Sequence, residues 1–142
     1  MSSTYIPPAL RQRVAEQARY RCGYCLTAEA IVGTPMEIDH IIPQSLGGPT
    51  EEENLWLACS LCNDHKSSRI AAMDLHTDEI VRLFDPRHQV WRDHFAWTAE
   101  SDRIVGLTPT GRATVTALHL NRPSLVRARQ AWVSVGWHPP TD

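Results

Sequence analysis

Four cysteines fall as two closely spaced pairs, Cys22 with Cys25 and Cys59 with Cys62. Each pair has the CxxC spacing that folds into a tight knuckle, and Gly23 relieves the turn of the first one. Four thiolates leave no open position on a tetrahedral ion, so the pattern predicts a structural Zn²⁺ site. The alternatives are a redox CxxC motif or two incidental pairs, but two pairs in one chain favour zinc.

A second group of polar side chains lies between the cysteine pairs and just beyond the second one. Asp39 and Asn63 offer a carboxylate and an amide oxygen, which are hard ligands suited to Mg²⁺ or Mn²⁺. His40 beside such an ion can act as a general base, because an imidazole with a pKa of ~6.5 is mostly neutral at pH 7. Asn54 can fix the tautomer of that ring.

Each of these four residues also has an ordinary structural role. His40 alone would be read as a buried histidine, Asp39 as a turn cap, and the two asparagines as helix caps. Neighbours on a strand point to opposite faces, so Asp39 and His40 can act together only if the strand ends or twists there. Pro43 follows closely and favours such an end.

These residues belong to motifs that occur in a fixed order. The motifs are Asp39-His40-x-x-Pro43, Gly47-Gly48, Asn54-Leu55 and Cys59-x-x-Cys62-Asn63-x-x-Lys66. In this order and spacing, residues 22–69 resemble the HNH nuclease family, which has a zinc-stapled ββα-metal core. Residues 83–123 resemble, more weakly, the C-terminal part of small stand-alone bacterial members.

The resemblance implies a metal-dependent endonuclease that hydrolyses DNA phosphodiester bonds. It assigns His40 as general base, and Asn54 as the residue that orients it, by side chain or by pinning the loop. Asp39 and Asn63 are the implied ligands of one catalytic Mg²⁺, Mn²⁺ or similar divalent ion, and the four cysteines those of the structural zinc. Asn63 stands where the eponymous pattern has histidine, and its amide oxygen favours harder ions than imidazole does.

Three further residues are candidate phosphate contacts: His65, Lys66 and Arg69. His65 lies two residues beyond Asn63, which is ~200° around a helix, so it is not expected to share the ion. The alternative role of Lys66 is that of a solvated helix lysine.

Two other functions compete with an active endonuclease. One is a catalytically inactive zinc module that binds nucleic acid or protein, and the other is a toxin or other effector nuclease. The intact set of Asp39, His40, Asn54 and Asn63 argues against an inactive module. An effector usually needs a delivery domain, for which 142 residues leave no room.

The coarse pattern predicts an α+β fold: a ββα-metal core stapled by zinc, flanking helices, and a C-terminal strand pair plus two helices. Before the core we expect a helix over 9–20, and within the core strands over 36–42 and 55–58 and a helix over 60–68 that begins with Ser60 as N-cap. Beyond it we expect strands over 92–98 and 103–108, then helices beginning at Thr108-Pro109 and near Pro123. The chain is expected to be a single domain over 1–142, with the core at 22–69 and an accessory part at 70–142.

Composition excludes several classes of protein. With 42% hydrophobic and 21% charged residues, the chain is expected to be globular and not disordered. No apolar run approaches ~18 residues, so no membrane association is expected. Met1 to Pro8 is polar and does not resemble a secretory signal, which predicts a cytoplasmic protein with reduced thiols.

The chain has a formal net charge of −2, so it lacks the excess of basic residues that is typical of strong nucleic-acid binders. No separate base-reading module is evident, so DNA is expected to be bound with low intrinsic sequence specificity. The oligomeric state is left open by the sequence.

Overall fold

The computed structural model describes residues 5–141. Short helices and two-stranded antiparallel sheets make up an α+β fold, which confirms the predicted fold class. The chain forms two compact units, residues 5–70 with 85–89 and residues 71–84 with 90–141. The return of residues 85–89 to the first unit was not predicted from the sequence.

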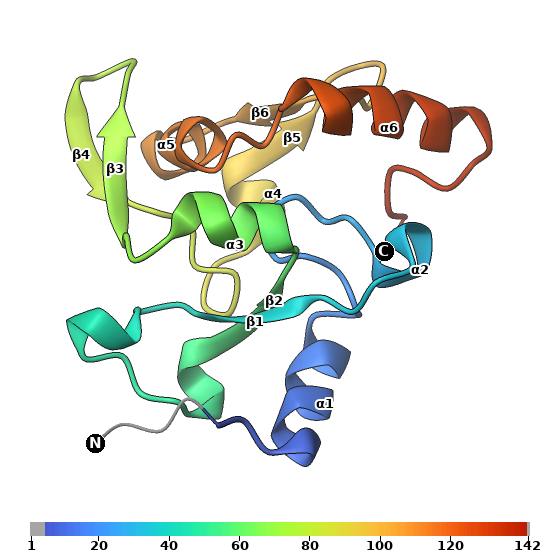
Figure 1. The fold of residues 1–142 in the computed structure, drawn as a ribbon. Helices are drawn as coiled ribbons and strands as arrows, with labels where there is room; N and C mark the ends of the chain where they lie inside the picture. Colours follow the sequence, from blue (N-terminus) through green and yellow to red (C-terminus); the bar gives the residue numbers. More distant parts are fainter. Residues whose placement is uncertain (1–4, 142) are drawn as a thin grey trace. The chain divides into compact units, whose positions relative to one another are not determined.

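Two antiparallel strands form the centre of the first unit, β1 (Glu37–His40) and β2 (Leu55–Ala58). His40 pairs with Leu55 at the end of the ladder, so β1 stops at His40. Helix α3 (Ser60–Lys66) follows β2 and lies against β1 (Figure 1). This order confirms the predicted strand, loop, strand and helix.

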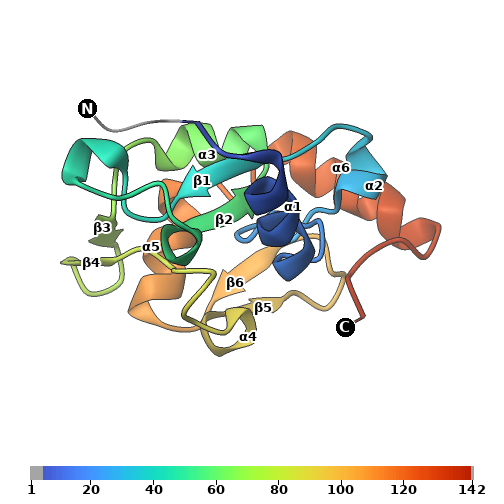
Figure 2. The same ribbon diagram turned by 90° about the horizontal axis from the view of Figure 1, so that it is seen from below.

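The opposite side of this hairpin is covered by α1 (Pro8–Gln17), as Figures 1 and 2 show. Pro8 is tolerated in the first helical turn, and the helix buries Val14 and Ala15. A short helix, α2 (Glu29–Val32), follows the first cysteine knuckle. The long β1–β2 connection contains two 3₁₀ turns, η1 (Gln44–Leu46) and η2 (Glu52–Asn54).

The second unit has its own core and its own elements. These are β3 (Ala71–Asp74), β4 (Glu79–Arg82), α4 (Trp91–His94), β5 (Phe95–Trp97), β6 (Ile104–Gly106), α5 (Pro109–Ala117) and α6 (Pro123–Ser134). Strand β3 pairs with β4, and β5 with β6. The rings of Phe84 and Phe95 meet edge to face at 5.1 Å inside this core.

Several element boundaries differ from the prediction. The β3–β4 hairpin was missed because it buries little: Met73 and Ile80, which pair across it, are both exposed. The strand expected over 92–98 begins only at Phe95, since the residues before it form α4. The N-cap of α3 is Cys59, whose Sγ accepts from the Cys62 amide, and not Ser60.

No helix among residues 5–141 is long and apolar enough to cross a membrane. The expectations about residues 1–4 and 142 lie outside the described residues.

Candidate functional site

The four cysteines converge in the first unit. Their Sγ atoms all lie within 4.8 Å of one another, and none forms a disulfide. A tetrahedral site with Zn–S bonds of ~2.3 Å places its sulfurs ~3.8 Å apart. Cys25 and Cys59 match that spacing, with their Sγ atoms at 3.8 Å.

The backbone around the cluster also fits a metal-bound thiolate set. The amide of Tyr24 points at Cys22 Sγ, and the amide of Cys62 points at Cys59 Sγ, each at 3.4 Å. Such N–H groups stabilise the negative charge of thiolate ligands. The cluster therefore fits the predicted Zn²⁺, closed on all sides by protein ligands.

Asp39 lies on β1 and is almost fully buried, with 3% of its surface exposed. Its Oδ1 accepts from Lys66 Nζ at 3.1 Å, and its Oδ2 accepts from the Tyr24 hydroxyl at 2.7 Å. Burial raises the pKa of Asp39, and the Lys66 ammonium and the Tyr24 hydroxyl oppose that rise. Burial and the Asp39 charge raise the pKa of Tyr24, so its hydroxyl stays a donor.

Lys66 does not lie where the sequence suggested. It is 2% exposed, and its Nζ bridges Asp39 and the carbonyl oxygen of His40, which it reaches at 2.9 Å. The helical periodicity of α3 turns Lys66 toward β1, where a buried carboxylate needs a cation. Neither a phosphate contact nor a solvated lysine describes this position.

Replacing Lys66 by alanine is therefore expected to destabilise the first unit by ~3–5 kcal/mol, because it strands a buried carboxylate without its cation. Denaturant unfolding of Lys66→Ala measures this loss. Arg11→Ala, which alters an exposed cation on α1 in the same unit, is the control. A loss below ~1 kcal/mol would show that Lys66 is an ordinary surface lysine.

His40 ends β1 and is half-buried. Its Nε2 lies 2.9 Å from the hydroxyl of Thr50, which also accepts from the Gln44 amide at 3.2 Å. Burial lowers the pKa of His40, an effect that Asp39 opposes and Lys66 strengthens. The ring is therefore neutral at pH 7 and free to take up a proton.

The Asn54 side chain makes its hydrogen bonds to the loop that leads away from His40 and not to the His40 ring. Its Oδ1 accepts from the Ile42 amide at 2.8 Å, and its Nδ2 donates to the carbonyls of Ile42 and Pro49, both at 2.9 Å. Gly48 makes this closure possible, since a Cβ there would collide with the Ile42 carbonyl. These contacts hold the loop that carries Thr50, and the role of Asn54 in orienting His40 stays a prediction.

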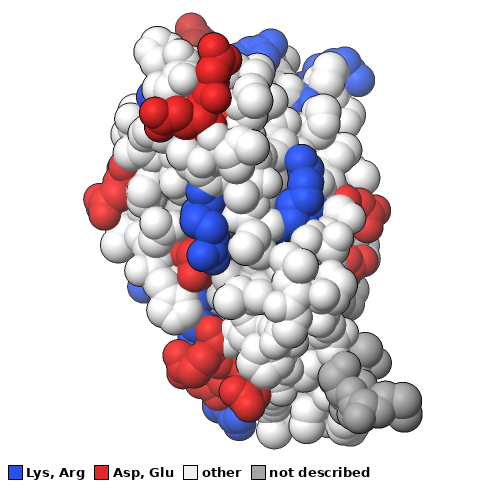
Figure 3. Space-filling view, turned by 90° about the vertical axis from the view of Figure 1, so that its left-hand side faces the viewer, with Lys and Arg blue, Asp and Glu red and all other residues white. Residues whose placement is uncertain are grey.

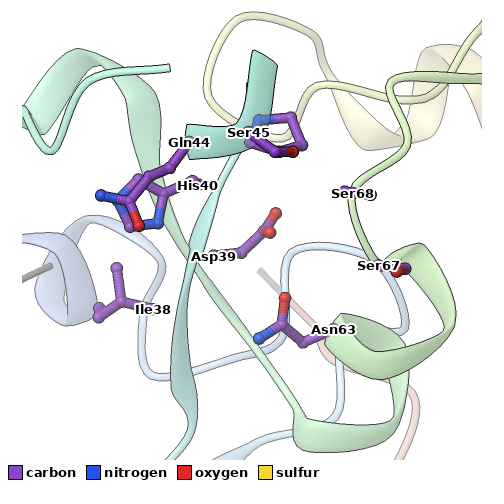
Figure 4. Close-up of a pocket in the computed structure, with 9 residues that line it drawn as sticks. Ile38, Asp39, His40, Gln44, Ser45, Asn63, Ser67 and Ser68 are labelled. Atoms are coloured by element: carbon purple, nitrogen blue, oxygen red, sulfur yellow. The ribbon is translucent and has the colours of Figure 1, made fainter. Parts of the chain in front are cut away.

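Asp39, His40 and Asn63 line one cavity of about 200 Å³, together with Ile38, Pro43, Gln44, Ser45, Ser67 and Ser68. Figure 4 shows the amide oxygen of Asn63 directed toward the carboxylate of Asp39, while His40 lies on the other side of β1 beside Gln44. The Asn63 Nδ2 donates to Glu37 at 2.8 Å, which fixes this orientation of the amide. Two oxygens of the kind that bind hard cations thus face the same space.

Comparison with protein families gives this arrangement a name. Residues 22–69 match the family model described as HNH endonuclease. We name residues 22–69, about a third of the chain, the HNH domain after this match. The match covers the same residues as the resemblance seen in the sequence, and it points to a nuclease. No curated protein and no solved structure matches the chain significantly.

The other two candidate phosphate contacts lie at the end of the HNH domain. Arg69 is exposed, but its guanidinium donates to the carbonyls of His65 and Lys66 and so caps α3. His65 is half-buried on the same turn. Neither lines the cavity, because His65 lies ~200° around α3 from Asn63 and Arg69 lies beyond the end of that helix.

Two residues of the HNH domain that contact the site were not predicted from the sequence. Tyr24 stands between two zinc ligands, and that position was the only signal for it. Thr50 follows the Gly-Gly-Pro stretch and carried no signal, since one threonine in a loop is not distinctive. Both contact the predicted catalytic residues directly.

Proposed function

We propose that the protein is a metal-dependent endonuclease that hydrolyses DNA phosphodiester bonds. The observation that carries the proposal is the shared cavity, which His40, Asp39 and Asn63 all line at the end of β1 and on α3. The match of residues 22–69 to the HNH endonuclease model supports a nucleic acid as substrate.

In this proposal His40 is the general base, acting through Nδ1. Nε2 is occupied by Thr50, whereas Nδ1 makes no hydrogen bond to any residue in 5–141. The Thr50 oxygen has two lone pairs, so it can accept from Gln44 and from a protonated Nε2 at once. That tautomer leaves Nδ1 unprotonated, ready to accept a proton from the attacking water.

Asp39 and Asn63 would hold the catalytic divalent ion. Each carboxylate oxygen of Asp39 has two lone pairs and uses one for Lys66 or Tyr24, so acceptor positions remain for an ion. The ion supplies charge stabilisation to the phosphoryl and leaving oxygens. The hydroxyls of Ser45, Ser67 and Ser68 add neutral polar groups to the cavity wall.

Charge at the surface is consistent with weak DNA binding. On the face seen in Figure 3, Lys and Arg side chains form separate groups interspersed with Asp and Glu. Burial also removes Lys66 and Arg129 from the cations available to phosphates. Few phosphates are then neutralised at once, so we propose weak DNA binding with a shallow dependence on salt concentration.

The test is cleavage of supercoiled plasmid with Mg²⁺ or Mn²⁺ and in the presence of a chelator that leaves the zinc in place. We expect cleavage only with the added ion, and a requirement for more of it in Asp39→Ala. Asp64→Ala, on the exposed side of α3, is the control. Full activity after prolonged chelation would contradict the one-metal proposal.

Thr50→Val keeps the shape of the side chain and removes its hydroxyl. We expect cleavage to slow by ~10–100-fold, because a base held in the wrong tautomer or displaced by ~1 Å loses its alignment. Thr50→Ser retains the hydroxyl and should restore most of the rate. Equal rates for Thr50→Val and the parent would exclude the assigned role of Nε2.

A further inference from the structure

Tyr24 lies between the zinc ligands Cys22 and Cys25 and is completely buried. Its backbone amide points at Cys22 Sγ, and its hydroxyl donates to Asp39 Oδ2 at 2.7 Å. One residue therefore contacts both a zinc thiolate and the carboxylate assigned to the catalytic ion.

The carboxylate of Asp39 is held from two sides. Lys66 donates to Oδ1 from α3, and Tyr24 donates to Oδ2 from the first cysteine knuckle. The carboxylate cannot rotate about its Cβ–Cγ bond without losing both donors. The lone pairs that remain are thereby held in one orientation.

The knuckle that carries Tyr24 is itself fixed to the sheet. The Gly23 amide donates to the Leu57 carbonyl of β2 at 2.8 Å. A Cβ at Gly23 would collide with the Trp56 ring and with Pro86, so the knuckle can approach this closely only with glycine. Leu57 pairs in turn with Ile38, the neighbour of Asp39 on β1. The knuckle is therefore tied to Asp39 both through the backbone of the sheet and through the Tyr24 hydroxyl.

We infer that Tyr24 is the positioning residue through which the zinc knuckle sets the geometry of Asp39 for the catalytic ion. This rests on the proposed role of Asp39 as a ligand. The zinc then does more than hold the chain together, because its ligand loop determines where a catalytic side chain points. Donors behind a metal ligand typically contribute ~10–100-fold to metal affinity.

The test is Mn²⁺ binding to the full-length, zinc-loaded protein, followed by the electron paramagnetic resonance signal of free Mn²⁺. Tyr24→Phe removes one oxygen atom, and we expect it to weaken Mn²⁺ binding by ~10–100-fold at unchanged zinc content. Tyr20→Phe, which alters a tyrosine that is 44% exposed near the same knuckle, should bind like the parent. Unchanged Mn²⁺ affinity in folded Tyr24→Phe would overturn the inference.

Binding is measured apart from cleavage, so the two proposals fail separately. A parent that binds Mn²⁺ through Asp39 but cleaves no nucleic acid would refute the proposed function, while Tyr24→Phe still tests the positioning role. A parent whose Mn²⁺ affinity is the same in Asp39→Ala would overturn the inference as well, since Asp39 would hold no ion.

A second measurement needs no variant at position 24. The chain has three tyrosines, so 3-fluorotyrosine labelling gives three fluorine resonances, and Tyr5→Phe and Tyr20→Phe assign that of Tyr24 by elimination. We expect Mg²⁺ to shift the Tyr24 resonance with a midpoint equal to the Mg²⁺ dissociation constant that follows from its competition with Mn²⁺. A resonance that stays in place through that titration would count against the coupling.

Discussion

Replacing His40 by alanine is expected to slow cleavage by ~10²–10⁴-fold, the usual contribution of a general base. The side chain is half-buried and makes one side-chain hydrogen bond, to Thr50, so the fold should lose only about 1 kcal/mol. Zinc content should not change, because no cysteine contacts the imidazole. Single-turnover cleavage and thermal unfolding of the same preparation measure both effects.

His88→Ala is the matched control for that variant. The His88 side chain is 56% exposed, pairs with Asp85 and takes no part in the cavity. The His88→Ala variant should cleave at the rate of the parent. If His40→Ala also cleaves at that rate, another group is the base and the assigned chemistry is wrong.

Loss of a single zinc ligand is expected to have the largest effect on stability. Structural zinc contributes ~10–16 kcal/mol of apparent binding free energy, which is as large as the whole ~5–15 kcal/mol stability of a typical domain. Cys22→Ala should therefore lose its zinc and unfold the HNH domain, and not merely lower its activity. Metal analysis and hydrogen exchange over residues 22–69 measure the two losses.

Ser60→Ala, which changes an exposed residue next to Cys59, is the control. It should keep the zinc content of the parent and the protection of its amides against hydrogen exchange. Parent protein that purifies without zinc, with four thiols that titrate readily, would refute the zinc assignment. Cys22→Ala that keeps the protection of the parent would show that the four-cysteine cluster is not what holds the domain.

The parts of the fold that were predictable from sequence are those with local signals. The CxxC spacing brings each pair of sulfurs together within one turn, and the four-cysteine cluster is what the structure contains. β2 was predicted at its observed bounds, Leu55–Ala58, because an apolar run ends at a cysteine knuckle. Helix α5 begins at Thr108-Pro109 as predicted, with Thr108 accepting from the Gly111 amide.

The network around Asp39 was not predictable in the same way. Lys66 is the one lysine in the chain, and a lysine on a short polar helix gives no sign of burial. Its position depends on the packing of α3 against β1, which brings together residues 27 apart in sequence. Thr50 reaches His40 only because Asn54 folds the intervening loop back on itself.

The most direct test of the central claim uses the zinc-loaded parent on covalently closed circular DNA, both single- and double-stranded, with Mg²⁺ or Mn²⁺. A circle has no ends, so any cut is endonucleolytic. We expect nicked or linear products in the presence of the ion, and none with His40→Ala under the same conditions. Intact circles throughout, from a protein that holds its zinc and still binds the DNA, would contradict an endonuclease and identify a catalytically inactive zinc module.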